Sequence, residues 1–113
     1  MARKKTRQKA NNKAVATDTE WAILNAVYAN PGITAPEVHE QLHKQRGWTY
    51  STVKTMMDRL VKKKVLKTKK LRNIFLYNPV KQEDTIKKEE AKRFINRVFD
   101  GDKKKALEFI KKA

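Results

Sequence analysis

Two helix-start signals lie close together early in the chain and limit the folds open to it. Residues 17–20 (TDTE) and residues 34–37 (TAPE) each place a threonine three residues before a glutamate. In this capping-box spacing the hydroxyl and the carboxylate satisfy each other's backbone donors at a helix N-terminus. Apolar residues recur at helical intervals behind each signal, and a glycine follows each segment. The sequence therefore predicts two short helices, over 18–29 and 35–46.

A third helix is predicted from the N-cap Thr49 to about Lys63. With about 100° per residue, its apolar and polar side chains fall on opposite arcs. The apolar arc holds Val53, Met56, Met57, Leu60 and Val61, and the polar arc holds Ser51, Lys54, Thr55, Asp58, Arg59 and Lys62. Short hydroxyls lead the polar arc and cations follow, which suits a helix inserted N-terminus first into a DNA major groove. An ordinary solvated face is the alternative.

Two β-prone segments follow, residues 65–70 and 74–79, on either side of a polar turn. This pattern predicts a hairpin. Three short helices and a hairpin indicate a mainly α fold class, a winged helix-turn-helix domain over residues 17–80. The wing tip, residues 69–73, is expected along a phosphate backbone or in the minor groove. Trp21, Trp48, Phe75 and Tyr77 are interpreted as packing residues.

The net charge of +16 is unevenly distributed along the 113 residues. Residues 1–16 carry six basic side chains and no acid, whereas residues 17–45 have a net charge of −3. Residues 46–72 carry ten basic side chains and one acid, Asp58. This distribution predicts one face that meets a polyanion, with a ribosomal or other generic basic protein as the alternative.

The two ends of the chain differ in pattern. Residues 1–16 lack periodicity and are interpreted as a disordered basic arm. Residues 81–113 regain helical periodicity with apolar groups that the first domain does not need, so they are predicted to be a dimerisation region, with folding back onto the domain as the alternative. The expected interface residues are Ala91, Phe94, Ile95, Val98, Phe99, Leu107, Phe109 and Ile110.

Several classes of protein are excluded or disfavoured by composition. The chain has no cysteine, which removes disulfides and thiolate metal sites. No apolar run approaches the ~18 residues of a membrane span, and no apolar stretch follows the basic start. We therefore expect a cytoplasmic protein without membrane insertion, without a cofactor and without enzymatic activity.

One segment matches a zinc-protease motif, because residues 39–43 read His-Glu-Gln-Leu-His on a predicted helix. His39 and His43 could share one face and bind zinc, with Glu40 as the base. A catalytic zinc needs a third protein ligand, and the chain has only these two histidines. A zinc hydrolase is therefore kept only as a remote alternative, and no metal site is expected.

From about Thr19 to Ile110 the sequence resembles the penicillinase-repressor family, which includes methicillin-resistance and copper-responsive repressors. The resemblance rests on Glu20-Trp21, residues 47–55 (GWTYSTVKT), residues 58–63 (DRLVKK), residues 75–79 (FLYNP), residues 94–99 (FINRVF) and Gly101. It implies a bacterial transcriptional repressor that binds an inverted-repeat DNA operator as a homodimer. In the family, the positions of Ser51, Thr52, Lys54 and Thr55 meet DNA.

Pattern and resemblance together give a set of expected DNA contacts. They are Thr34, Ser51, Thr52, Lys54, Thr55, Arg59, Lys62, Lys69, Lys70 and Arg72. A non-specific nucleic-acid-binding or architectural protein is the alternative function.

This sequence departs from the family pattern at two places that matter for regulation. Some members are released from DNA when a membrane sensor protease triggers cleavage of an Asn-Phe bond. The resemblance therefore implies such a protease as a further partner. The matching pair in this sequence is Glu108-Phe109, which has glutamate in place of asparagine. The copper-responsive members use a C-terminal cysteine cluster, which this chain lacks.

Overall fold

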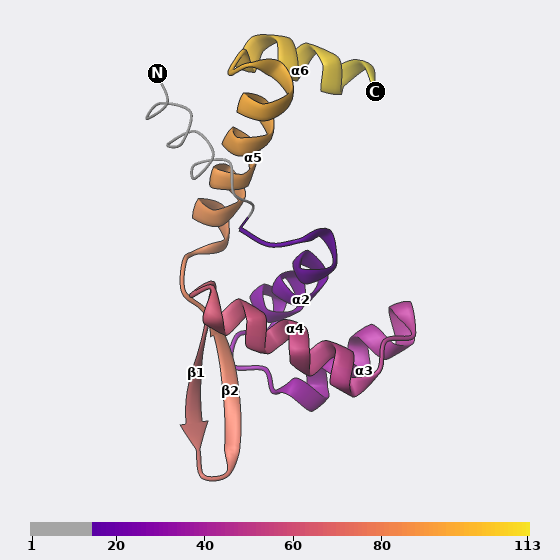
Figure 1. Ribbon diagram of the computed structural model, residues 1–113, viewed down its shortest axis with the longest axis vertical. Helices are drawn as coiled ribbons and strands as arrows, with labels where there is room; N and C mark the ends of the chain where they lie inside the picture. Colours follow the sequence, from indigo (N-terminus) through magenta and orange to yellow (C-terminus); the bar gives the residue numbers. More distant parts are fainter. Residues whose placement is uncertain (1–14) are drawn as a thin grey trace, which may run out of the picture. The chain divides into compact units, whose positions relative to one another are not determined.

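The computed structural model describes residues 15–113, which form two compact units, residues 15–83 and residues 84–113 (Figure 1). Residues 1–14, most of the predicted basic arm, lie outside the described residues. Of the remaining two residues of that arm, Val15 is half-buried and Ala16 is buried. No helix within residues 15–113 is long and apolar enough to cross a membrane.

The three helices of the first unit begin where the capping signals predicted. They are α2 (Asp18–Ala29), α3 (Ala35–Arg46) and α4 (Tyr50–Lys62). Thr17 and Thr34 each form a complete capping box with the glutamate three residues later, and Thr49 accepts from the Thr52 amide. Gly47 ends α3 in the left-handed conformation (φ 72°), which glycine adopts without steric cost. Both predicted boxes and the Thr49 cap are thus confirmed.

The predicted hairpin is present, with a tighter tip than expected. Strand β1 (Leu66–Leu71) pairs antiparallel with β2 (Ile74–Pro79), and Leu71 lies opposite Ile74. The turn is therefore only Arg72-Asn73, with Arg72 at a φ of 57°. The prediction that Leu71 belongs to the turn and Val65 to the strand was wrong by one residue, because the Leu71–Ile74 pair closes a two-residue turn.

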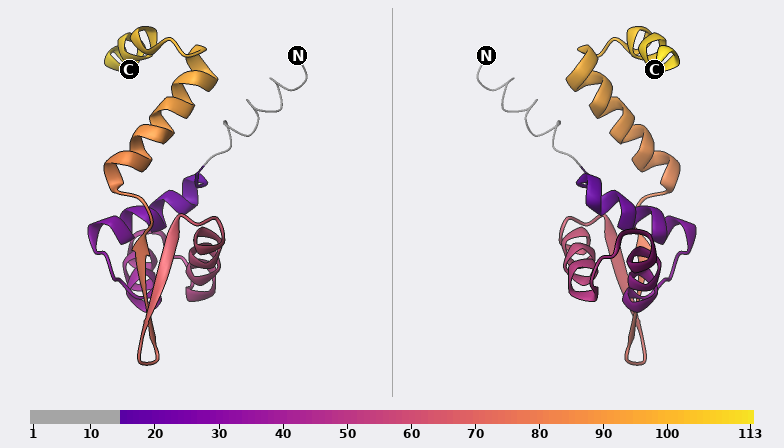
Figure 2. Two further views of the ribbon diagram at one scale, coloured as in Figure 1. Left: turned by 90° about the vertical axis from the view of Figure 1, so that its left-hand side faces the viewer. Right: turned by 90° about the vertical axis from the view of Figure 1, so that its right-hand side faces the viewer.

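A short third segment attaches the hairpin to the helices. Ile33 forms an isolated antiparallel bridge with Tyr77, in which the Tyr77 amide donates to the Ile33 carbonyl at 2.9 Å. The Gly32 amide donates to the Tyr77 carbonyl at 2.9 Å as well. These bonds fix the base of the hairpin beside the α2–α3 connection, while its tip extends away from the helices (Figure 2).

The core of the first unit lies between the three helices and the base of the hairpin. Its fully covered side chains come from every element, namely Ile23, Leu24, Val27, Val38, Leu42, Val53, Met57, Leu60, Leu66 and Tyr77. The apolar arc of α4 is confirmed, with Val61 half-buried at its margin. Phe75 was predicted to be a packing residue and is instead 49% exposed, because it lies one pair from the end of the two-stranded hairpin, opposite Lys70.

The second unit consists of two helices, α5 (Glu83–Phe99, whose first residue belongs to the first unit) and α6 (Lys103–Lys112). Helix α5 ends at a turn in which the Gly101 amide donates to the Ile95 carbonyl at 3.1 Å, and Asp102 caps α6. Ala106 is fully buried, and Phe99 contacts Phe109 with ring centroids 5.7 Å apart. Large apolar side chains nevertheless remain exposed, namely Val98, Leu107, Phe109 and Ile110.

Candidate nucleic-acid interface

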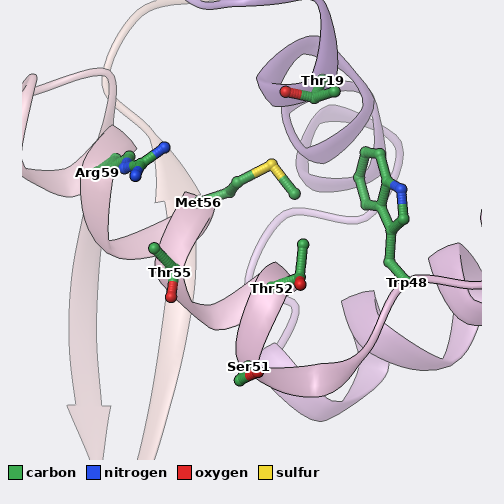
Figure 3. Close-up of a pocket in the computed structure, with 7 residues that line it drawn as sticks. All are labelled: Thr19, Trp48, Ser51, Thr52, Thr55, Met56 and Arg59. Atoms are coloured by element: carbon green, nitrogen blue, oxygen red, sulfur yellow. The ribbon is translucent and has the colours of Figure 1, made fainter.

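The outward face of α4 is bordered by a groove that also involves α2. The groove has a volume of about 380 Å³ and is lined by Thr19, Trp48, Ser51, Thr52, Thr55, Met56 and Arg59 (Figure 3). In Figure 3 the α4 side chains form one wall, and Thr19 and Trp48 stand opposite them. The sequence predictions included the α4 hydroxyls and Arg59 but missed Thr19, because no periodicity relates α2 to α4. Trp48 was missed because it was interpreted as a packing residue.

The hydroxyls at the start of α4 differ in how far the protein already uses them. Thr49 bonds the Thr52 amide and hydroxyl, at 3.3 and 3.0 Å, and lies 3.4 Å from the Ser51 hydroxyl. Within residues 15–113, no hydrogen bond involves the side chain of Thr55 or of Arg59. Among the residues that line the groove, Thr55 and Arg59 are therefore fully available to an external ligand.

Arg59 forms no ion pair within residues 15–113, although Asp58 precedes it in sequence. Asp58 pairs instead with Lys54, whose ammonium lies 2.7 Å from the carboxylate. The acid at the start of α2, Glu20, pairs with Lys63, also at 2.7 Å. The structure thus leaves the Arg59 guanidinium exposed on the same face as Thr55.

Lys54 lies on the wing side of α4 and is half-buried. The Asp58 carboxylate, and to a smaller extent the Tyr77 hydroxyl, raise the pKa of Lys54 above its ordinary value against the effect of desolvation. Lys54 is therefore a cation held by one acid, whereas the predicted contact Lys62 is an exposed cation at the end of the same helix.

The wing carries the remaining predicted cations. Lys69, Lys70 and Arg72 are all exposed, and the Lys70 ammonium lies 5.7 Å from the centre of the Phe75 ring. Thr34, also a predicted contact, is half-buried and caps α3: its amide and hydroxyl donate to the Glu37 carboxylate at 2.9 and 3.0 Å. These bonds lower the pKa of Glu37, with the Thr34 amide as the main cause.

A second groove, which we call the wing cleft, lies on the other side of α4. It has a volume of about 330 Å³ and is lined by Thr34, Ala35, Pro36, Tyr50, Lys54, Asn73, Ile74, Phe75 and Tyr77. Most of this lining is apolar or aromatic. The sequence predictions placed Thr34 and Lys54 at the interface but did not assign Tyr50, Ile74 or Phe75 to it. An aromatic residue at the first position of α4, Tyr50, was the feature of the sequence that could have indicated this cleft.

A partly buried ion pair fixes the C-terminal end of α4 against α2. Glu20 is only 2% exposed, and it accepts from the Lys63 ammonium at 2.7 Å and from the Thr17 amide at 3.0 Å. Burial alone would raise the pKa of Glu20, but the bonds from Lys63 and Thr17 outweigh it and hold that pKa below its ordinary value. The pair therefore positions the exposed face of α4.

The zinc-protease motif belongs to the contact between α3 and α4. The His39 and His43 rings lie 5.4 Å apart, and His39 meets the Tyr50 ring edge-on at 5.8 Å. The His43 Nδ1 atom lies 3.2 Å from the Trp48 carbonyl oxygen. In the part of the chain that the structure describes, no cluster of three or more His, Asp or Glu side chains could hold a metal.

Comparisons with known proteins identify the family. The penicillinase repressor family model matches residues 16–113. The penicillinase repressor of Staphylococcus aureus is 32% identical over 103 residues, covering 90% of this chain and 82% of the relative. The methicillin resistance regulatory protein MecI of Mammaliicoccus sciuri is 33% identical over 85 residues, covering 75% and 69%.

Solved structures agree with the sequence relatives. The DNA binding domain of the repressor BlaI matches with a TM-score of 0.55 and 31% identity, over 59% of this chain and 82% of that one. The monomeric form of Bacillus licheniformis BlaI, in complex with the blaP half-operator, matches with a TM-score of 0.54 and 31% identity, over 60% and 83%. The predicted fold class and resemblance are confirmed: this chain belongs to the penicillinase repressor family, whose members are winged-helix repressors and not enzymes.

Proposed function

We propose that this protein is a DNA-binding transcriptional repressor that binds an inverted-repeat operator as a homodimer. The observation that carries the proposal is the outward face of α4, where Thr55 and Arg59 are exposed and have no side-chain partner among residues 15–113. Hydroxyl and guanidinium groups on one helix face match the donor and acceptor pattern of base edges in the major groove. The relative solved with a half-operator supports the same ligand class.

In this proposal the contacts divide into base readers and phosphate contacts. Ser51, Thr52 and Thr55 stand at the N-terminal half of α4 and would reach base edges or the nearest phosphates. The exposed cations Lys62, Lys69 and Arg72 would neutralise phosphates, with Lys70 beside them. Phosphate contacts supply affinity that falls steeply with salt, whereas base contacts supply specificity.

The dimer part of the proposal rests on the second unit. Val98, Leu107, Phe109 and Ile110 are 53%, 49%, 63% and 55% exposed, which is unusual for large apolar side chains in so small a unit. A second copy that covers them would place two α4 helices on successive half-sites, about one turn or ~34 Å apart. Cleavage at Glu108-Phe109, within α6, would remove Phe109 and Ile110 from this surface and so relieve repression.

A selection from random-sequence duplexes tests the proposal. Rounds of binding at physiological salt are expected to yield an inverted-repeat consensus with half-sites one helical turn apart. A library that shows no consensus after several rounds would instead support the non-specific, architectural function. Cytoplasmic localisation is part of the proposal, because such a repressor acts on chromosomal DNA.

A further inference from the structure

The wing cleft lies on one side of the outward face of α4, within the first unit of the structure. Tyr50 and Lys54 stand four residues apart on α4 and form one wall, while Ile74 and Phe75 of β2 form the other. Tyr50, Ile74 and Phe75 are 42%, 52% and 49% exposed, so the apolar surface of the cleft is open to a ligand.

The geometry of a duplex sets what can occupy a cleft in this position. If α4 enters the major groove, as proposed above, a wing beside it must lie over or beyond the neighbouring sugar–phosphate strand, because that strand separates the two grooves. The strand presents apolar deoxyribose C–H groups towards one side and charged phosphate oxygens towards the other. A protein cleft that receives this strand should therefore combine apolar side chains, which pack on the sugars, with cations, which meet the phosphates.

The wing cleft has this distribution. Its lining includes the cation Lys54, and Lys70 and Arg72 lie on the adjoining strand and turn. From residue 59 to residue 82 the sequence contains no acidic residue. The acids beside the cleft lining are Asp58, which pairs with Lys54, and Glu37, which accepts from the Thr34 cap. Charge complementarity favours one occupant, a polyanionic backbone, over an uncharged peptide or lipid.

We propose that the wing cleft binds the sugar–phosphate strand that separates the two DNA grooves, with Tyr50 and Phe75 packed on deoxyribose and Lys54 on an adjacent phosphate. This inference rests on the proposed function and adds a site to it. The apolar residues of that site contact deoxyribose and so do not distinguish one DNA base from another. Tyr50 and Phe75 thus contribute affinity for every DNA sequence, whereas Thr55 contributes preference for particular bases.

The test compares Tyr50→Ala and Phe75→Ser with the wild-type protein on a selected operator and on random duplex, at several salt concentrations. Each variant is expected to bind both DNAs about five- to tenfold more weakly. The slope of log affinity against log salt should stay unchanged, because no charge is removed. Val80→Ser, just beyond the end of β2 and 45% exposed but outside both the cleft and the wing tip, is the matched control and should bind like the wild type.

Hydroxyl-radical footprinting supplies a readout that loss of folding cannot imitate, because the radical attacks deoxyribose. Protection of a few sugars on one strand of each half-site should disappear in Tyr50→Ala and Phe75→Ser, while protection of guanine N7 in the major groove persists. Phe75→Leu, which keeps an apolar side chain, should restore the sugar protection.

Wild-type affinity and an unchanged sugar footprint in both variants would overturn the cleft assignment while leaving the repressor function intact. A changed base preference in Tyr50→Ala would also overturn it, because Tyr50 would then be a base reader. Failure of the repressor function itself would be recognised separately, by wild-type protein that shows no preferred site.

Discussion

The ammonium nitrogen of Lys63 lies 2.7 Å from a carboxylate oxygen of Glu20, although the two residues are far apart in sequence. Lys63 is the C-cap residue of α4, and Glu20 belongs to the capping box that opens α2. The carboxylate is almost fully buried, whereas the Lys63 side chain is 38% exposed. One contact therefore joins the cap of the first helix to the end of the helix that faces outward.

Replacing Lys63 by methionine should destabilise the protein, because Glu20 would remain buried without its cation. An exposed pair is worth about 0.2–1 kcal/mol, and breaking a fully buried one costs about 3–5 kcal/mol. For this half-exposed pair we expect Lys63→Met to lower the free energy of unfolding by about 1–3 kcal/mol at pH 7, measured by urea denaturation. Lys64→Met, next along the chain and exposed, is the matched control.

The same pair predicts a pH dependence. The pKa of Glu20 in the folded protein is lower than its ordinary value of 4.5, so its stabilising contribution is complete above that value and is lost as the pH falls through the folded pKa. Once Glu20 is protonated it carries no charge, so the loss of the Lys63 cation no longer destabilises the folded protein. The difference in unfolding free energy between wild type and Lys63→Met should therefore shrink between pH 6 and pH 3, and a constant difference would show that the pair is not responsible.

Asp58 is the acidic residue within the otherwise basic segment of residues 46–72. Its carboxylate holds the Lys54 ammonium and adds a negative charge beside the proposed DNA surface. Asp58→Asn should raise the affinity for operator and random duplex alike by about two- to tenfold at low salt, measured by fluorescence anisotropy. Glu40→Gln, which neutralises an exposed acid of α3, is the control; weaker DNA binding by Asp58→Asn would instead mean that the pair aligns Lys54.

The proposed dimer surface can be tested by placing a charge at Leu107, which is 49% exposed. Burying an unpaired carboxylate in an apolar interface is expensive, so Leu107→Glu should raise the dimer dissociation constant at least about 100-fold. Sedimentation equilibrium measures this directly. Lys104→Gln changes the net charge by the same amount on the same helix and should leave the dimer intact.

Local patterns in the sequence predicted the helices well, for identifiable physical reasons. Capping boxes depend on residues three apart, and so the starts of α2 and α3 could be read directly from Thr17 and Thr34. The start of α4 was predicted from the N-cap Thr49 alone, because no glutamate stands three residues later. The turns were less readable, because Lys64, Arg72 and Asp100 adopt positive φ without the glycine that usually marks such positions.

The candidate site was only partly readable, because its remaining parts depend on the tertiary fold. Periodicity identified Thr55 and Arg59 on the outward face, but it could not show that Asp58 pairs with Lys54 and leaves Arg59 unpaired. Nothing local links Thr19 to α4, or Phe75 to Tyr50, although each pair lines one groove. Such relationships arise from the packing of α2 and the hairpin against α4.

The most direct test of sequence-specific recognition by α4 is the ratio of affinities for the selected operator and for random duplex. We expect the wild-type ratio to reach about 10³ or more at physiological salt. Thr55→Ala should reduce the ratio about tenfold with the salt slope unchanged, whereas Lys69→Ala should weaken both DNAs equally and reduce the slope by about one. A wild-type ratio near one, with random duplex bound as tightly as the operator, would contradict the account.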